Sequence, residues 1–144
     1  MNSVPLLSPL RYDILKTYPI SSGFGYRHDP ITGQSSFHAG LDLPAPFGTP
    51  VYATADGIIT KVDYEQFGLG LYVVINHDNG FETIYGHLSK FHFPEGYKLH
   101  RGQLLARVGT TGKSTGNHLH YAIKKDGVLI DPLPFCYFLL YNQN

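Results

Sequence analysis

The sequence predicts an all-β fold, made mostly of antiparallel strands joined by glycine-rich loops. Three observations indicate it: short apolar and β-branched runs recur, 16 glycines and 10 prolines supply turns, and no segment keeps a helical period. The 11 tyrosines and 9 phenylalanines are also typical of strands. With 144 residues, the chain is expected to form one domain with its own core.

Residues 1–20 are expected to form an N-terminal arm that packs on the domain. Three prolines interrupt this stretch, and one short helical turn is expected around Tyr12–Lys16. Ser21–Arg27 is predicted to be a strand or an extended entry. His28–Gln34 is predicted to be a loop because it contains Asp-Pro and Thr-Gly pairs.

Further strands are expected where apolar residues cluster between turn residues such as Asn79-Gly80 and Asp126-Gly127. In the run that ends at His87, alternation places Phe81, Thr83, Tyr85 and His87 on one face. The domain is predicted to span residues 21–132, and residues 133–144 to form a tail that packs on it. The expected strands are Pro50–Thr54, Ile58–Asp63, Leu71–Asn76, Phe81–His87, Leu104–Val108 and His118–Lys124, the last paired with Val128–Ile130.

Composition excludes several classes of function. The formal net charge is zero, which removes the usual electrostatic argument for nucleic acid or an anionic membrane. No apolar run approaches the 18 residues of a membrane span, and no signal peptide is recognisable. The single cysteine, Cys136, has no partner for an internal disulfide. No nucleic acid partner is therefore expected, and a monomer is the expected state.

Eight histidines are many for this length, and two of them lie in Gly116-Asn117-His118-Leu119-His120. On a strand, His118 and His120 point to the same face. Such a pair can share a metal, or one imidazole can bind the metal while the other handles a proton. A buried or merely exposed pair is the structural alternative.

His38 and Asp42 form a second candidate pair. On a straight strand their α-carbons would lie about 13 Å apart, whereas two ligands of one zinc need donor atoms within about 3–4 Å of each other. The backbone must therefore bend between them, and Gly40 permits a bend. The alternative is an Asx-type turn with a surface histidine.

Together, His38, Asp42 and one histidine of the 118/120 pair give two imidazoles and one carboxylate. This set is typical of a catalytic zinc site, which keeps a position for water. His87 ends a strand and is a candidate general base or oxyanion partner. His28, His77, His92 and His100 are not expected to bind metal, although His28 is placed where it could touch substrate.

Six motifs follow one another in a specific order over residues 21–132, which is most of the chain. This order resembles the lysostaphin-type, or LytM-domain, zinc metalloendopeptidases of bacterial cell walls. The motifs are Ser22–Arg27 (SGFGYR), Pro30 with Gly33, His38-x3-Asp42, Gly48–Val51 (GTPV), Tyr85-x-His87-Leu88, and Gly112-x-Ser114-Thr115-Gly116-x-His118-Leu119-His120.

The resemblance implies a compact β-structure with a long groove and a Zn²⁺ ion on its floor. It implies that His38, Asp42 and His120 bind the zinc and that His87 and His118 are catalytic. It also implies hydrolysis of peptidoglycan peptide bonds by activated water, in the cell envelope. Groove walls that bind substrate are expected at Phe24, Tyr26, Arg27 and the Ser114–Asn117 loop, with Thr115 and Asn117 as its candidate residues.

One departure from the family pattern is Ala122, where relatives often carry a glutamate that could orient His120. Some relatives have lost the metal ligands and only activate other hydrolases. That alternative, a non-catalytic peptidoglycan-binding module or amidase activator, predicts broken ligand positions, and these are intact. A lipoyl-type carrier is a second alternative, but the Asp78-Asn79-Gly80 turn lacks the lysine that such a carrier displays.

Overall fold

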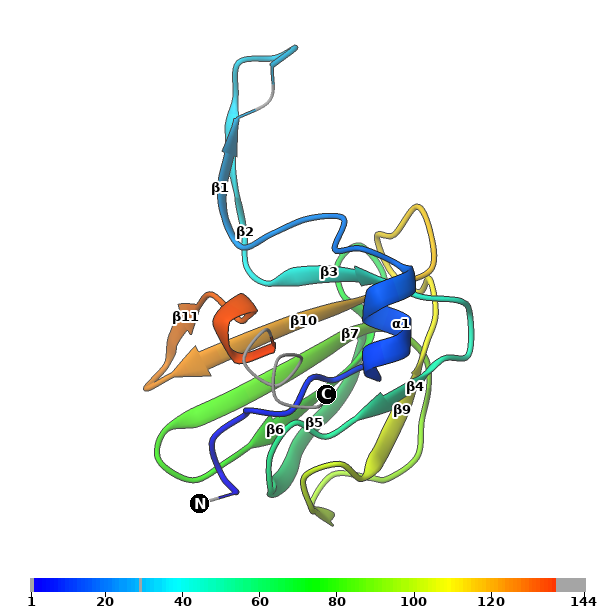
Figure 1. Ribbon diagram of the computed structural model, residues 1–144, viewed down its shortest axis with the longest axis vertical. Coiled ribbons are helices and arrows are strands. Elements are labelled where there is room, and N and C mark those ends of the chain that lie inside the picture. The colour runs from blue at the N-terminus through cyan, green and yellow to red at the C-terminus, as the bar shows by residue number, and fades with distance from the viewer. Residues whose placement is uncertain (1, 29, 137–144) are drawn as a thin grey trace.

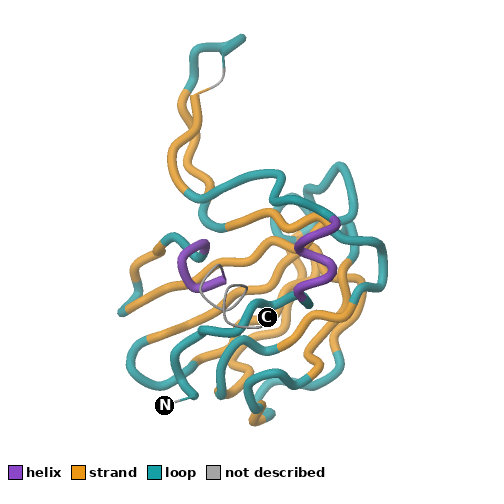
Figure 2. Tube along the Cα trace, in the orientation of Figure 1, coloured by secondary structure: helices purple, strands orange, loops and turns teal. Residues whose placement is uncertain are grey.

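The computed structural model describes residues 2–28 and 30–136. Within them lie a short helix, eleven strands and a helical turn at residues 133–136 (Figure 1; Figure 2). Every described strand pair is antiparallel, so the predicted all-β class is confirmed. The elements are α1 (Tyr12–Thr17), β1 (Gly25–His28), β2 (Ser35–His38), β3 (Leu41–Pro44), β4 (Pro50–Tyr52), β5 (Gly57–Glu65), β6 (Gly70–Asn76), β7 (Phe81–Phe91), β8 (Lys98–Leu99), β9 (Leu104–Val108), β10 (His118–Lys125) and β11 (Val128–Ile130).

Nine of these strands form one sheet, whose main path runs β11-β10-β7-β6-β5-β8. The start of β10 also pairs with β3, and β9 joins the far part of β7 to β4. The hairpin turns expected at Asn79-Gly80 and Asp126-Gly127 are present, and all four residues have positive φ. This is the conformation that asparagine, aspartate and glycine tolerate best.

The remaining two strands, β1 and β2, form a separate hairpin that projects away from the sheet (Figure 1; Figure 2). Its register pairs Gly25 with His38 and Arg27 with Ser36. β1 begins at Gly25, later than expected from Ser21, and β2 and β3 were not expected as strands. Both are four residues long and carry polar residues or proline, which weakens any strand signal.

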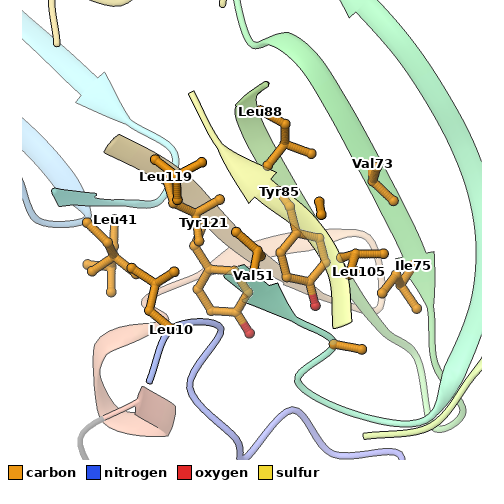
Figure 3. Packing of buried hydrophobic residues seen from close by; sticks show 14 of the residues in the cluster. Leu10, Leu41, Val51, Val73, Ile75, Tyr85, Leu88, Leu105, Leu119 and Tyr121 are labelled. Carbon is orange, nitrogen blue, oxygen red and sulfur yellow. The ribbon is translucent and has the colours of Figure 1, made fainter. Parts of the chain in front are cut away.

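The core is built from buried side chains of the sheet and of the N-terminal segment. Figure 3 shows Tyr85 and Tyr121 among these side chains, and their ring centroids are 5.4 Å apart. Both hydroxyls are hydrogen-bonded to Thr54 Oγ1, at 3.1 and 2.9 Å, so the buried polar atoms are satisfied. The core residues include Leu10, Leu41, Leu43, Val51, Val73, Ile75, Leu88, Leu105, Leu119 and Ile123.

The N-terminal segment lies against β4 and the loop that follows it. Leu10 is buried, and the backbone of Tyr52 donates to the Pro9 carbonyl at 2.8 Å. Helix α1 agrees with the expected turn near Tyr12–Lys16. At the other end, Phe135 packs on Phe81 and Cys136 is buried, while residues 137–144 of the predicted tail lie outside the described residues. No helix of the described chain has the length and apolar character needed to cross a bilayer.

Candidate metal centre

Three side chains from separate strands meet at one point: His38 at the end of β2, Asp42 in β3 and His120 in β10. One potential ligand atom from each lies within 4.8 Å of the other two. Asp42 Oδ1 is 3.3 Å from His38 Nε2 and 3.2 Å from His120 Nδ1. The β3–β10 ladder places Asp42 directly opposite His120, so strand pairing brings together residues 78 positions apart. The structure thus brings together the three residues expected to bind metal.

The chain bends between His38 and Asp42 at Gly40, which lies between β2 and β3. A Cβ atom at this position would lie 2.3 Å from the Tyr121 carbonyl oxygen and 3.1 Å from His120 Nε2. The expected bend is therefore present. The glycine is required because β10 approaches so closely, since any larger residue would push on the strand that carries His120.

Two more imidazoles lie beside the triad, those of His118 and His87. The ring centroids of His118 and His87 are 4.7 Å apart, and His87 lies 6.1 Å from His120. His118 Nε2 is 3.6 Å from Asp42 Oδ1. His118 shares the face of β10 with His120, as alternation predicts.

His87 also points to this side of the sheet, so the prediction that it shares a face with Tyr85 is wrong. The ring of Tyr85, two residues earlier, lies in the core against Tyr121. His87 has φ of 60°, so its side chain leaves the β7 strand on the opposite face, beside His118. A run of strand-forming residues does not reveal a left-handed backbone at one position.

Backbone carbonyls orient three of the four imidazoles. The Nδ1–H of His38 donates to Gly23 O at 2.8 Å, and that of His87 donates to Thr111 O at 2.7 Å. The Nδ1–H of His118 donates to Gly116 O at 2.9 Å. With Nδ1 occupied as a donor, the neutral ring presents its Nε2 lone pair to the site. His120 differs, because its Nδ1 faces Asp42 and its Nε2 has no hydrogen-bond partner among the described residues.

The lack of a hydrogen-bond partner for His120 Nε2 in the described part of the chain agrees with the departure noted at Ala122. Ala122 is buried two residues along the strand from His120, and a methyl group accepts no hydrogen bond.

Charges and burial set the protonation states at the site. Burial opposes ionisation of Asp42, but the hydrogen bond with His120 and the nearby His38 and His118 rings outweigh it and lower the pKa of this carboxyl. Burial also lowers the pKa of His87 from its ordinary value, against the effect of its bond to the Thr111 carbonyl. Asp42 is therefore an anion and His87 a neutral imidazole near pH 7.

The five residues line an open pocket of about 540 Å³. Of the expected substrate-binding residues, Arg27 and Thr115 line it, whereas Phe24, Tyr26 and Asn117 do not. Tyr26 pairs with Phe37 on the face of the hairpin opposite to that of His38. The sequence analysis did not single out Glu65 or Lys113, which also line the pocket. Lys113 occupies an open position of the last motif and Glu65 lies outside all six motifs, so only the folded structure identifies them.

Four histidines (His28, His77, His92 and His100) lie outside the group of His38, Asp42 and His120, and none of them, His28 included, lines the pocket. His77 is buried, its Nδ1 donates to Asp56 O at 2.7 Å, and its Nε2 is hydrogen-bonded to Thr83 Oγ1 at 2.8 Å. His28 is exposed in the projecting hairpin, and His100 is exposed beyond β8. None of these three belongs to a metal-binding group of the described residues.

Two imidazoles and one carboxylate beside an open pocket match the ligand pattern of catalytic zinc sites. The donor set fits a zinc ion, because its donors are two imidazole nitrogens and a carboxylate oxygen. The family model "Peptidase family M23" matches residues 36–132. The chain belongs to this family.

Curated relatives agree with that assignment. The chain is 47% identical over 114 residues to the DD-carboxypeptidase/endopeptidase Mpg of Neisseria meningitidis, covering 79% of this chain and 26% of that protein. It is 41% identical to the peptidoglycan DD-endopeptidase ShyC of Vibrio cholerae, covering 78% of this chain and 26% of the relative. The chain thus spans about a quarter of the length of these relatives.

Solved structures show the same fold. A zinc-containing peptidase from Vibrio cholerae superposes with a TM-score of 0.78 at 37% identity, over 86% of this chain and 37% of that chain. The catalytic domain of lysostaphin from Staphylococcus simulans gives a TM-score of 0.74 at 30% identity, over 88% of this chain and 97% of that domain. The lysostaphin-type fold expected from the motifs is confirmed.

Proposed function

We propose that the protein is a zinc-dependent endopeptidase that hydrolyses peptide bonds of bacterial peptidoglycan. The observation that carries the proposal is the convergence of His38, Asp42 and His120 within 4.8 Å of one another, beside two further oriented imidazoles in an open pocket. Membership of the M23 family and relatives named peptidoglycan DD-endopeptidases support the substrate class. These names favour a bond between D-amino acids.

The three residues would hold the ion through His38 Nε2, Asp42 Oδ1 and His120 Nδ1, which are the atoms that face one another. When bound, zinc supplies a Lewis acid that lowers the pKa of water and polarises the scissile carbonyl. The lowered pKa of Asp42 keeps this ligand anionic, and the Gly23 carbonyl fixes His38 with Nε2 free to bind.

His87 and His118 divide the proton transfers of amide hydrolysis. Because each donates Nδ1–H to a backbone carbonyl, each presents Nε2 to the pocket as a proton acceptor when neutral. One ring takes the proton of the attacking water. The other acts in its imidazolium form, in which the Nε2–H stabilises the oxyanion or is transferred to the leaving amine. The lowered pKa of His87 favours its acceptor form near neutral pH.

The protein is proposed to act as a monomer in the cell envelope, where peptidoglycan is found. This location follows from the substrate proposed.

Mass analysis of digested peptidoglycan tests the proposal. Purified peptidoglycan is incubated with zinc-loaded protein, with chelated protein and with zinc-loaded His118→Ala. We expect cross-linked muropeptides to be lost only with the zinc-loaded wild type, and the product masses to identify the bond. Unchanged muropeptides in all samples, with zinc shown to be bound, would contradict hydrolysis and favour the non-catalytic wall-binding module.

A further inference from the structure

One face of the projecting β1–β2 hairpin is the face that carries His38, a member of the metal triad. Gly25 pairs with His38, and two positions further along Arg27 pairs with Ser36. Residues two apart on a strand share a face, at a spacing of about 7 Å. Arg27 therefore lies on the His38 face, and its side chain lines the same pocket. The other two residues on this face, Gly25 and Ser36, have small side chains or none.

The Arg27 guanidinium is hydrogen-bonded to the side chain of Ser22, whose backbone pairs with the proposed metal ligand Asp42. Its Nη1 donates to Ser22 Oγ. The backbone of Ser22 in turn forms a bridge with Asp42, whose N–H donates to Ser22 O at 2.9 Å. Arginine has five N–H donors, so this one bond leaves most of the guanidinium fork for a ligand.

A second cation, Lys113, lines the pocket from the 109–117 loop. Its backbone N–H donates to Gly68 O at 2.8 Å, which holds this loop against the β5–β6 turn. Among the described residues, neither Arg27 nor Lys113 has a carboxylate within ion-pair distance. Within residues 2–28 and 30–136, therefore, no carboxylate neutralises either cation of the pocket.

The remaining acid of the pocket, Glu65, is engaged elsewhere. Its Oε1 accepts from the Leu69 backbone N–H at 3.3 Å and so stabilises the β5–β6 turn. The charges of Arg27, Lys113, Asp42 and Glu65 cancel formally, and a divalent ion on the triad would leave the pocket with a charge of +2. A positive, partly enclosed pocket attracts an anionic ligand.

We propose that Arg27, with Lys113 adding to the positive potential, binds a free carboxylate of the substrate peptide within one or two residues of the scissile amide. This inference rests on the proposed peptidase function and adds a charge requirement to it. The planar guanidinium pairs with a carboxylate through two parallel hydrogen bonds, which gives it geometric selectivity. An amide in place of the carboxylate loses the charge and offers only one acceptor.

The test compares cross-linked muropeptides from one peptidoglycan preparation with the same muropeptides after their carboxylates have been converted to primary amides. Hydrolysis is measured with zinc-loaded wild type, Arg27→Gln and Lys113→Gln. The matched control is Arg101→Gln, which removes an exposed arginine outside the pocket. Equilibrium binding of both muropeptides to zinc-loaded His118→Ala is measured by calorimetry, so that recognition is observed without turnover.

We expect wild type to favour the unmodified muropeptide by about 10-fold in kcat/KM and in affinity, as for a partly exposed charged hydrogen bond. Arg27→Gln should reduce this ratio to about one and Lys113→Gln should lower it partly, whereas Arg101→Gln should keep it. Equal cleavage of both muropeptides by wild type would overturn the carboxylate proposal and leave the peptidase intact. Cleavage of neither would contradict the peptidase, and the calorimetry would still decide whether the pocket distinguishes a carboxylate from an amide.

Discussion

Tyr85 and His87 are two residues apart on β7, yet their rings lie on opposite faces of the sheet. The left-handed backbone at His87, with φ of 60°, produces this reversal. For a residue with a Cβ this conformation costs about 1–2 kcal/mol. The bonds from His87 N to Leu69 O (2.6 Å) and from its Nδ1 to Thr111 O (2.7 Å) offset that cost. Strain is thus placed at an imidazole proposed to act in catalysis.

Replacing His87 with glycine or with alanine should separate the effect of the left-handed backbone on stability from the effect of the imidazole on catalysis. Both variants lack the imidazole, so peptidoglycan hydrolysis should fall by about 100-fold or more in each. Glycine adopts positive φ without strain, so the glycine variant should have a free energy of unfolding about 1 kcal/mol above that of the alanine variant. Urea denaturation of the two variants measures this difference. If the alanine variant proved equally stable, the left-handed strain at this position would be refuted.

The two histidines of the Gly116–His120 stretch should respond differently to alanine. His120→Ala removes a proposed ligand atom and should abolish stoichiometric zinc binding as well as hydrolysis. His118→Ala leaves His38, Asp42 and His120 in place, so it should bind zinc and still lose about 100-fold or more in rate. Zinc content by atomic absorption and the hydrolysis rate are measured on the same samples. Near-normal activity of His118→Ala would show that its assigned role is wrong.

Gly40→Ala should disturb the centre without changing any ligand. The new Cβ would lie 2.3 Å from the Tyr121 carbonyl, so the β10 strand must shift, at a cost of about 1–3 kcal/mol. We expect weaker zinc affinity and a lower free energy of unfolding. Gly23→Ala is the matched control, because Gly23 is also next to the site and a Cβ there meets nothing within 4 Å. Equal losses of zinc affinity in both variants would contradict the steric explanation.

His77 should make stability depend on pH. Burial lowers the pKa of its imidazole in the folded protein, while in the unfolded chain it protonates near pH 6.5. Unfolding therefore takes up a proton below about pH 6.5, so stability falls as the pH drops, by at most about 1.4 kcal/mol per pH unit from this group. His77→Gln should flatten the dependence measured by urea denaturation between pH 7.5 and pH 5. An unchanged slope would assign the acid sensitivity to other groups.

Much of the sheet could be predicted because its signals are local. The strands near residues 58–63, 71–76 and 104–108 were expected from apolar, β-branched runs, and both tight turns from their Asn-Gly and Asp-Gly pairs. The pairing of β3 with β10 could not be predicted from the same signals. It depends on contacts between distant segments, and Leu41–Pro44 alone is too short and mixed to identify as a strand.

In the candidate site, too, some features follow from local sequence signals and others depend on contacts between distant segments. The order of motifs identified the five residues that the structure gathers, although their catalytic roles remain proposals. Which pocket residues surround them depends on tertiary pairing. Tyr26 and Arg27 are neighbours in sequence, but the β1–β2 register places only Arg27 on the His38 face. Lys113 reaches the pocket because its loop packs on the β5–β6 turn, and Glu65 because β5 ends there; no periodicity in the sequence predicts either position.

The carbonyls that orient His38, His87 and His118 belong to the main chain of Gly23, Thr111 and Gly116. Every amino acid carries that carbonyl, so substitutions at these positions preserve the hydrogen bond wherever the backbone path is preserved. An insertion or deletion would move the oxygen itself and turn the ring. During evolution, the segments that carry these carbonyls should therefore tolerate substitutions far better than insertions or deletions.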